Sequence, residues 1–588
     1  MKIPLRVPLI SRAARAAVVV TVFLAGGETA LWGAEKEKPT GVVGPVVKNV
    51  DVSITNLDVV VTDSKGNRVT GLRKEDFEVI EDGLQQIVTN FYVVEAGMLK
   101  VVGDDPVPAP VEAAAAAAPS KVEAGNAEVA PLPVLKTKIV IFVDNLHITP
   151  SNRNRVLRNI EAFARTNVKD NVEAMVVTWE RSLKVLRKFT NDGRDVADVL
   201  KQVEEISAQG SARLSDRRDV LKAIDDSSNV DEAVSRIRSY ILAQKNDLDF
   251  TVEALKTAVN QLAGVEGKKI FLHVSDGLPQ SPGYELWLYA QEKYRNQSLL
   301  MNAQEFDKTA GFIGVIRNAN AAGVTIYAVD AGGLSVDSSV SAENRAMGAR
   351  LDTFAEQNNE QAMLTLMSEE TGGVAILNKN DITPALKDLE RDCTSYYSLG
   401  YRSLRSGADR PHKVDVKMKR KGLAARARRS YLEKSPETRI TEATLSALVF
   451  PRDDNPLAVG LETGTPAPAD RANFLVPIRI RVPYSRIMLL PDGPRLKGRL
   501  ILYFVVLDSV GKQSDLAQQS IPIEVEAKLF EAVSKKDFIY DARLMMIPGG
   551  QRLSIAVRDD LTNAVSYIQK SIFVSVFSGE AGTSGPKP

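Results

Sequence analysis

The feature that most constrains this chain is a repeated change between two spacings of apolar residues. Lys138 to Val143 and Ile270 to Val274 read as continuous buried strands. Between and after them, apolar residues recur at helical spacing, first at Val156, Leu157, Ile160 and Phe163. Strand, helix, strand in this order predicts a parallel sheet with helices on both faces. We therefore expect a doubly wound, Rossmann-like α/β domain over residues 136–431.

The ends of these strands locate a candidate binding surface. In open α/β sheets, ligands bind beyond the carboxyl ends of the strands, where the strand order reverses. Asp144 follows the first buried strand, and Asp276 follows a later one. We expect the two carboxylates to meet at one edge of the sheet. A polar, charge-rich helical insertion at about residues 207–249 is expected to cover that edge as a lid.

Strand patterns flank this domain on both sides. Residues 46–96 alternate between apolar and polar positions with turn signals, which predicts a small β domain. Residues 97–134 are rich in Ala, Pro, Glu and Val and predict a flexible linker. Residues 440–578 predict an immunoglobulin-like β-sandwich, followed by a loose tail over 579–588. The expected fold class is therefore multidomain, α/β plus β.

The N-terminal residues predict export. Basic residues precede the apolar run Ala16 to Ala25, and small residues near Ala34 fit a cleavage site, so residues 1–34 read as a secretory signal peptide. The run is shorter than the roughly 20 apolar residues of a membrane span. Trp32 fits a cleavage site poorly, and an uncleaved membrane anchor is the alternative. We expect a periplasmic or secreted protein.

Charge and residue counts exclude several classes of protein. Lys and Arg number 75 against 74 Asp and Glu, so no global field attracts nucleic acid or anionic lipid. The single cysteine, Cys393, excludes an intramolecular disulfide framework and is expected to be a small buried residue. The basic residues between Arg420 and Arg429 are expected on a solvated hairpin. No acid, base and nucleophile stand at a useful spacing, so we expect neither an enzyme nor a small-molecule substrate.

Ordered motifs across residues 46–431 resemble the acidobacterial VWFA-related family, whose members carry a von Willebrand factor type A domain. The matching segments are Leu57-Asp58-Val59-Val60-Val61-Thr62-Asp63, Val69-Thr70-Gly71-Leu72, Glu75-Asp76-Phe77-Glu78-Val79-Ile80-Glu81-Asp82-Gly83, Thr371-Gly372-Gly373, Tyr396-Tyr397-Ser398-Leu399-Gly400-Tyr401 and Ala427-Arg428-Arg429-Ser430-Tyr431. The resemblance implies a protein that binds other proteins.

The resemblance also implies a metal-ion-dependent adhesion site. In such sites, oxygen ligands from three loops hold Mg²⁺, Mn²⁺ or Ca²⁺, and a carboxylate of the partner fills an open position. Asp144 matches the first loop, and Asp276, preceded by Ser275, matches the third. The ligand of the middle loop falls at either Thr251 or Asp249.

The first loop departs from the pattern of the family. Its two serine positions hold Leu146 and Ile148, which offer no lone pair to a cation. Asn145, His147 or Thr149 supplies a replacement ligand only if the loop is rearranged. The alternative is structural: carboxylates that follow strands cap helices or hold turns by accepting backbone N–H groups.

Two classes of function follow. The first is an exported protein that mediates adhesion or protein–protein interaction through the upper edge of the α/β domain. The second is a structural component of an envelope complex without a ligand or metal site. In either case the expected partner is a protein, and the only route to a membrane is an uncleaved N-terminal segment.

Overall fold

The computed structural model describes residues 54–95, 97–101, 136–334, 353–403, 409–470, 472–509 and 511–575. These residues fall into two compact units, 54–439 and 440–575, called here the N-terminal and C-terminal units. The predicted signal peptide, the predicted tail and most of the predicted linker lie outside the described residues. None of the helices in the described ranges is long and apolar enough to cross a membrane.

The centre of the N-terminal unit is a six-stranded sheet in the order β11-β10-β9-β6-β7-β8. All neighbours are parallel except β7 and β8, which are antiparallel. The continuous apolar runs predicted as strands form its middle, since a strand buried on both faces carries no polar side. The strands are β6 (Thr137–Asp144), β7 (Val172–Trp179), β8 (Leu183–Thr190), β9 (Lys268–Ser275), β10 (Val324–Asp330) and β11 (Ala375–Ile376).

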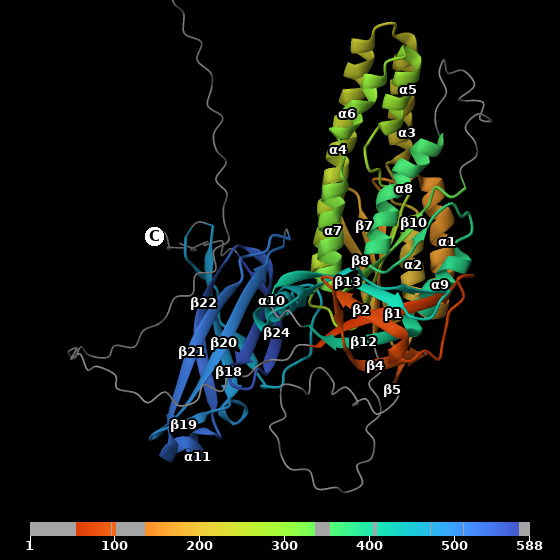
Figure 1. Ribbon diagram of the computed structural model, residues 1–588. Helices are drawn as coiled ribbons and strands as arrows, with labels where there is room; N and C mark the ends of the chain where they lie inside the picture. Colours follow the sequence, from red (N-terminus) through yellow and green to blue (C-terminus); the bar gives the residue numbers. More distant parts are fainter. Residues whose placement is uncertain are drawn as a thin grey trace, which may run out of the picture. The chain divides into compact units, whose positions relative to one another are not determined.

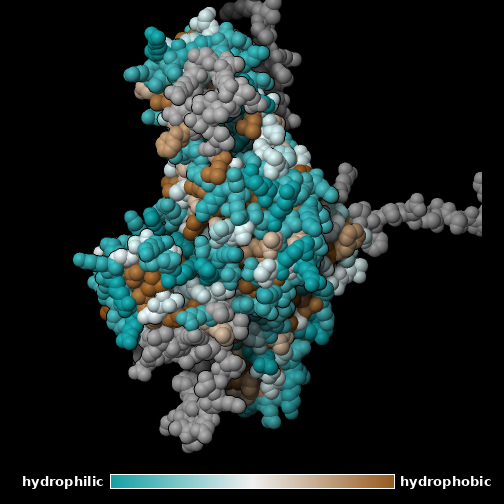
Figure 2. Space-filling view, turned by 90° about the vertical axis from the view of Figure 1, so that its right-hand side faces the viewer, coloured by the Kyte–Doolittle hydropathy of each residue, from teal (hydrophilic) through white to brown (hydrophobic). Residues whose placement is uncertain are grey.

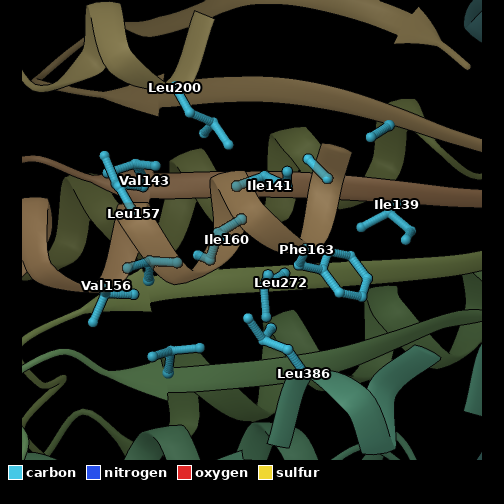
Figure 3. Packing of buried hydrophobic residues seen from close by; sticks show 14 of the residues in the cluster. Ile139, Ile141, Val143, Val156, Leu157, Ile160, Phe163, Leu200, Leu272 and Leu386 are labelled. Carbon is cyan, nitrogen blue, oxygen red and sulfur yellow. The ribbon is translucent and has the colours of Figure 1, made fainter. Parts of the chain in front are cut away.

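Helices cover both faces of this sheet (Figure 1). On one face, α1 (Pro150–Asn167), α2 (Gly193–Val203) and α9 (Thr383–Thr394) bury a continuous apolar cluster with β6, β7, β9 and β10, part of which Figure 3 shows. Cys393 belongs to this cluster, as expected, and burial raises the pKa of its thiol to about 12. Helices α7 (Thr309–Ala322) and α8 (Thr353–Glu370) pack on β10, and α4 (Val230–Gln261) packs on α7. The predicted α/β fold class is confirmed.

The predicted insertion is helical and forms a small core of its own. It comprises α3 (Gly210–Asp226) and the first part of α4, which continues without a break to Gln261. Leu221 and Ile237 of these helices pack against Trp287 of α5 (Tyr284–Tyr294), near the short α6 (Met301–Gln304). Figure 1 shows α3, α4 and α5 extending together from one end of the sheet.

Strands from two distant stretches form a β layer within the N-terminal unit. One sheet has the order β14-β1-β12-β4-β5 and the other β15-β13-β2-β3. The sequence predicts a separate β domain over 46–96, but its strands pair with strands from residues 396–433 that were assigned to the α/β domain. Met98–Val101, predicted as linker, forms β5 on β4. The strands are β1 (Ile54–Asp63), β2 (Phe77–Glu81), β3 (Leu84–Gln86), β4 (Val88–Glu95), β12 (Tyr396–Arg402), β13 (Arg410–Met418), β14 (Leu423–Arg426) and β15 (Ser430–Glu433).

The C-terminal unit consists of two antiparallel sheets around one apolar core, as the sandwich prediction requires. Val476, Ile478 and Ile480 face the core of the unit, and Arg479 between the last two points outward. Its elements are α10 (Pro436–Ala447), β16 (Gly460–Thr463), β17 (Ala467–Pro468), β18 (Phe474–Pro483), β19 (Leu490–Asp492), β20 (Arg495–Leu507), β21 (Ala517–Glu526), α11 (Phe530–Val533), β22 (Asp537–Met546), β23 (Gly549–Asp559) and β24 (Val565–Val574).

A buried ion cluster joins the β layer to the six-stranded sheet and its helices, which are called here the α/β layer. The side chain of Asp392 in α9 is 2% exposed, accepts a hydrogen bond from the Tyr327 hydroxyl and pairs with the guanidinium groups of Arg68 and Arg426. Arg426 also donates to the Gly372 carbonyl at 2.8 Å. The solvated hairpin predicted for the basic residues is therefore wrong for Arg426, because β14 pairs with β1 and turns this side chain toward the α/β layer.

We predict that Asp392→Asn lowers the free energy of unfolding of the N-terminal unit by about 3 kcal/mol, because two partly buried guanidinium groups lose their counter-charge. Denaturant unfolding of the full chain measures this loss. Asp388→Asn, an exposed carboxylate of the same helix, serves as the matched control and is expected to change stability by about 0.5 kcal/mol or less. Equal unfolding midpoints for the two variants would show that the cluster does not stabilise the unit.

Candidate functional site

The loops that follow β6 and β9 lie side by side at the carboxyl edge of the sheet. The two strands are parallel neighbours with the last paired residues Val143 and Val274. When the six strands are numbered 1 to 6 in chain order, from β6 to β11, their order across the sheet is 6-5-4-1-2-3. The strand order therefore reverses between β6 and β9. The backbone N–H of Asp276 donates to the His147 carbonyl at 2.8 Å, which links the loops directly. We call this edge the rim.

The Asp144 carboxylate holds its own loop. It is fully buried, and its Oδ1 accepts the N–H groups of Leu146 at 3.1 Å and His147 at 3.2 Å. Its Oδ2 lies 2.9 Å from Nδ1 of His147. Burial alone would raise the pKa of Asp144, but His147 and the loop N–H groups outweigh burial and lower it. These contacts are those of a turn-forming aspartate.

His273 of β9 lies beneath this loop. Its Nε2 is 3.9 Å from Oδ2 of Asp144, and its ring stacks on Phe142 at 5.6 Å. Burial lowers the pKa of His273 to about 4, although Asp144 opposes that shift. The imidazole is therefore neutral at pH 7. Ser275, the last residue of β9, also has a buried hydroxyl.

The Asp276 carboxylate occupies the N-terminus of α1. Its Oδ2 accepts the backbone N–H of Thr149 at 2.7 Å, and its Oδ1 accepts Nδ2 of Asn152 at 3.0 Å. A carboxylate at this position satisfies donors that the first turn of a helix leaves unpaired. Burial nevertheless raises the pKa of Asp276, with the hydrogen bonds acting against it.

The other predicted site residues divide into two groups. Thr251 lies near the Asp144 loop: its hydroxyl accepts Nε1–H of Trp179 at 2.9 Å and is 3.4 Å from Nδ1 of His147. Asn145 is buried, and its Oδ1 accepts Nη1 of Arg153 at 2.9 Å. Asp249 instead pairs with Lys245 and Lys308, because its position on α4 turns it toward those lysines.

These residues do not fit the adhesion-type cation site that the family resemblance implies. Leu146 and Ile148 are buried apolar side chains, 4% and 0% exposed, at the two positions where hydroxyl ligands are needed. Both oxygens of Asp144 and both oxygens of Asp276 already accept hydrogen bonds from the protein. A divalent cation at this place would have to displace those donors. The geometry favours the structural alternative for both aspartates.

A pocket of about 210 Å³ opens beside Asp276. Helices α3, α4, α5 and α8 line it together with the start of α1, so the insertion does cover the rim. Its charged side chains are Arg213, Arg217, Asp276, Glu285, Glu356 and Glu360. We call it the rim pocket. The glutamates were not predicted from the sequence: Glu356 and Glu360 are one helical turn apart, but the residue pattern does not show that their helix reaches the rim.

The carboxylates of the rim pocket outnumber its guanidinium groups. Arg217 pairs through Nε with Oε1 of Glu285 at 3.0 Å and through Nη2 with Oε2 of Glu356 at 2.6 Å. Nη1 of Arg213 is 3.8 Å from Oε2 of Glu360. Burial raises the pKa of Glu356 to about 7 and raises that of Glu360, and the neighbouring carboxylates add to both shifts. The pocket thus holds four carboxyl groups against two guanidinium groups, and the raised pKa values mean that Glu356 and Glu360 ionise less readily than free glutamate does.

Asp330, at the end of β10, is a further acid at the rim that was not predicted from the sequence. Its Oδ2 accepts Nε2 of Gln361 at 2.6 Å, and its Oδ1 accepts the N–H of Gly332 at 2.9 Å. Burial raises the pKa of Asp330 to about 6 despite these bonds, and Asp276 and Glu360 contribute by repulsion.

Neither the models of known protein families nor the curated protein sequences give a match to this chain. Among solved structures it is similar to the conserved hypothetical protein BatB from Bacteroides thetaiotaomicron, at 11% identity and a TM-score of 0.23, over 44% of this chain and 96% of that one. The PilB minor pilin from Streptococcus sanguinis is similar at 11% identity and a TM-score of 0.23, over 44% and 61% of the two chains. The human COPII-coat protein Sec24c is similar at 11% identity and a TM-score of 0.23, over 51% and 44%. The strand order of the chain itself establishes the α/β fold.

We predict that calorimetric titration of the full chain with Mg²⁺, Mn²⁺ or Ca²⁺ gives no binding heat that depends on Asp144 or Asp276, because hydrogen bonds occupy their oxygens. Asp144→Asn and Asp276→Asn are therefore expected to give the same traces as the unchanged protein. Saturable binding that either substitution removes would establish a cation site at the rim.

We predict that Asp330 makes stability fall as the pH rises from about 4 to 7. Its pKa in the folded protein, about 6, exceeds that of the unfolded chain, so folding favours its protonated form. This contribution is complete below the unfolded pKa and is lost as the pH rises through 6. Relative to Asp330→Asn, the unchanged protein should lose about 2.5 kcal/mol across this range in urea unfolding.

Asp216→Asn, which removes an exposed carboxylate of α3, is the control and should follow the profile of the unchanged protein. Parallel profiles for the unchanged protein and Asp330→Asn would rule out a raised pKa at this position.

Proposed function

We propose that this chain is an exported binding protein that recognises a basic segment of a protein partner. A lysine or arginine side chain of the partner enters the rim pocket of the α/β layer. The observation that carries the proposal is the excess of buried and partly buried carboxyl groups over guanidinium groups at the reversal point of the sheet, where α/β folds bind ligands.

An unsatisfied acceptor supports a ligand that donates hydrogen bonds. Glu285 is 4% exposed, and only its Oε1 is bonded to Arg217; its Oε2 has no hydrogen-bond partner among the described residues. A buried acceptor without a donor costs about 1–3 kcal/mol. An ammonium or guanidinium group in the pocket would supply donors and a charge that neutralises Glu356 and Glu360.

The size of the pocket supports one inserted side chain. Drug-sized ligands occupy pockets of about 300–1,000 Å³, whereas this pocket has about 210 Å³. On the face shown in Figure 2, hydrophilic residues predominate and hydrophobic residues form small separate patches, so recognition on that face would be polar as well.

Burial of the inner residues supports binding over catalysis. Asp144, His147, His273 and Ser275 are at most 2% exposed, so a substrate would not touch them. The reachable groups at the rim are carboxylates paired with arginines. Export is part of the proposal and is supported by the order of basic, apolar and small residues in the first 34 positions.

The test is fluorescence polarisation of the full chain with two labelled peptides, one with three arginines and one with citrulline at the same positions. We predict that the arginine peptide binds at least tenfold more tightly, because citrulline keeps the shape of arginine and lacks its charge. Glu356→Gln should weaken binding of the arginine peptide about tenfold, and added salt should weaken it further.

Glu369→Gln is the matched control, since Glu369 is an exposed glutamate on the same helix, α8. It should bind the arginine peptide like the unchanged protein. Equal affinity for the two peptides, or equal losses in Glu356→Gln and Glu369→Gln, would reject the rim pocket as the binding site.

A further inference from the structure

A histidine and two carboxylates come together in the β layer, away from the rim. Glu81 is the last residue of β2, Asp82 begins the turn to β3, and His412 lies in β13, which pairs with β2. The N–H of Asp82 donates to the Lys413 carbonyl at 2.9 Å, and Asp82 has a φ of +48°. That left-handed backbone lets two consecutive carboxylates turn toward one imidazole.

The three side chains present ligand atoms at close range. Nδ1 of His412 lies 3.0 Å from Oε1 of Glu81 and 2.9 Å from Oδ2 of Asp82. All three atoms lie within 4.8 Å of one another. Two ligands of one zinc ion, with bonds of roughly 2.0–2.2 Å, lie at most about 4.4 Å apart. The separations of 3.0 and 2.9 Å from Nδ1 fit that limit, and the two carboxylates need at most a small shift to meet it.

Two buried atoms in this group have no hydrogen-bond partner among the described residues. Glu81 is 2% exposed and its Oε2 is unpartnered, and His412 is 5% exposed with an unpartnered Nε2. Buried polar atoms are normally hydrogen-bonded, so the unpartnered Oε2 of Glu81 indicates that a partner is missing there, whereas Nε2 of His412 faces Glu433. The unpartnered Oε2 belongs to the same Glu81 carboxylate whose Oε1 lies beside Nδ1 of His412.

Hydrogen bonds from neighbouring residues orient the three side chains, as they commonly do for metal ligands in proteins. The hydroxyls of Ser403, at 2.7 Å, and Tyr431, at 3.1 Å, donate to Oε1 of Glu81. The N–H of Lys413 donates to Oδ1 of Asp82 at 2.9 Å, which orients that carboxylate. On the far side of the imidazole, Oε2 of Glu433 is 4.0 Å from Nε2 of His412. A carboxylate beside the second nitrogen is the usual partner of a metal-bound histidine.

We propose that Glu81, Asp82 and His412 form a zinc site, with Nδ1 of His412 and one oxygen of each carboxylate as ligands. Binding replaces the Nδ1 proton with the metal and leaves the Nε2–H tautomer facing Glu433; a proton on Nδ1 passes to solvent. One imidazole nitrogen with two carboxylates suits Zn²⁺, whereas Mg²⁺ and Ca²⁺ prefer oxygen ligands alone. Three protein ligands leave a fourth position for water.

The experiment is calorimetric titration of the full, metal-free chain with ZnSO₄. We expect one saturable site, which His412→Gln and Asp82→Asn abolish. Asp82 is partly exposed, so its substitution tests the site with less risk to folding. Glu433→Gln should weaken Zn²⁺ binding about 10- to 100-fold, since it removes only the support of the histidine.

Asp415→Asn removes an exposed carboxylate of the same strand, β13, and should bind Zn²⁺ like the unchanged protein. The chain has three histidines, so the imidazole resonances in a ¹H–¹⁵N spectrum identify the ligand: we expect only those of His412 to shift with Zn²⁺. No binding, or binding that survives both His412→Gln and Asp82→Asn, would overturn the proposal and leave a hydrogen-bonded ion cluster.

Discussion

Burial of both faces of the six-stranded sheet confines polar chemistry in the α/β layer to its rim. β6 and β9 run parallel as neighbours, so the loops after them emerge together, and Asp276 ties them through His147 and the N-terminus of α1. The helical insertion begins against the loop after β6, since the N–H of Gly210 donates to the Ile148 carbonyl. A Cβ at Gly210 would lie 2.5 Å from the Ile148 carbonyl carbon, so only glycine allows this approach. The rim pocket depends on that junction because Arg213 and Arg217 follow within two turns of α3.

Much of the α/β layer could be predicted because its signals are local. A continuous apolar run followed by a helical period identifies strand, helix and strand, and topology then brings Asp144 and Asp276 to one edge. The absence of hydroxyls at Leu146 and Ile148 is also visible in the sequence. The glutamates of the rim pocket could not be predicted, since Glu285 and Glu356 come from different helices and only the packing of α5 and α8 brings them to one place.

The β layer shows a different limit. Alternation of apolar residues predicts that residues 54–95 form strands, but it does not say which strands they pair with. The partner of Glu81 is Val414 in β13, and no local pattern connects positions so far apart. His412 therefore looks like an isolated histidine in the sequence, although the structure places it between two carboxylates. Zinc-binding motifs with short spacings are visible in a sequence, and ligand sets assembled by strand pairing are not.

The division of the β layer between two distant stretches has a consequence for folding during synthesis. β1 and β4 lie on either side of β12 and each pair with it, so neither completes its sheet until Tyr396–Arg402 has left the ribosome. Roughly 300 residues separate these strands from that partner, which at about 5–20 residues per second is a delay of roughly 15–60 s. During that interval the edges of the first strands are open to pairing with other chains. A chain of this topology therefore needs protection while it is being made, and the α/β layer, whose own strands lie almost entirely between the two stretches, can fold first.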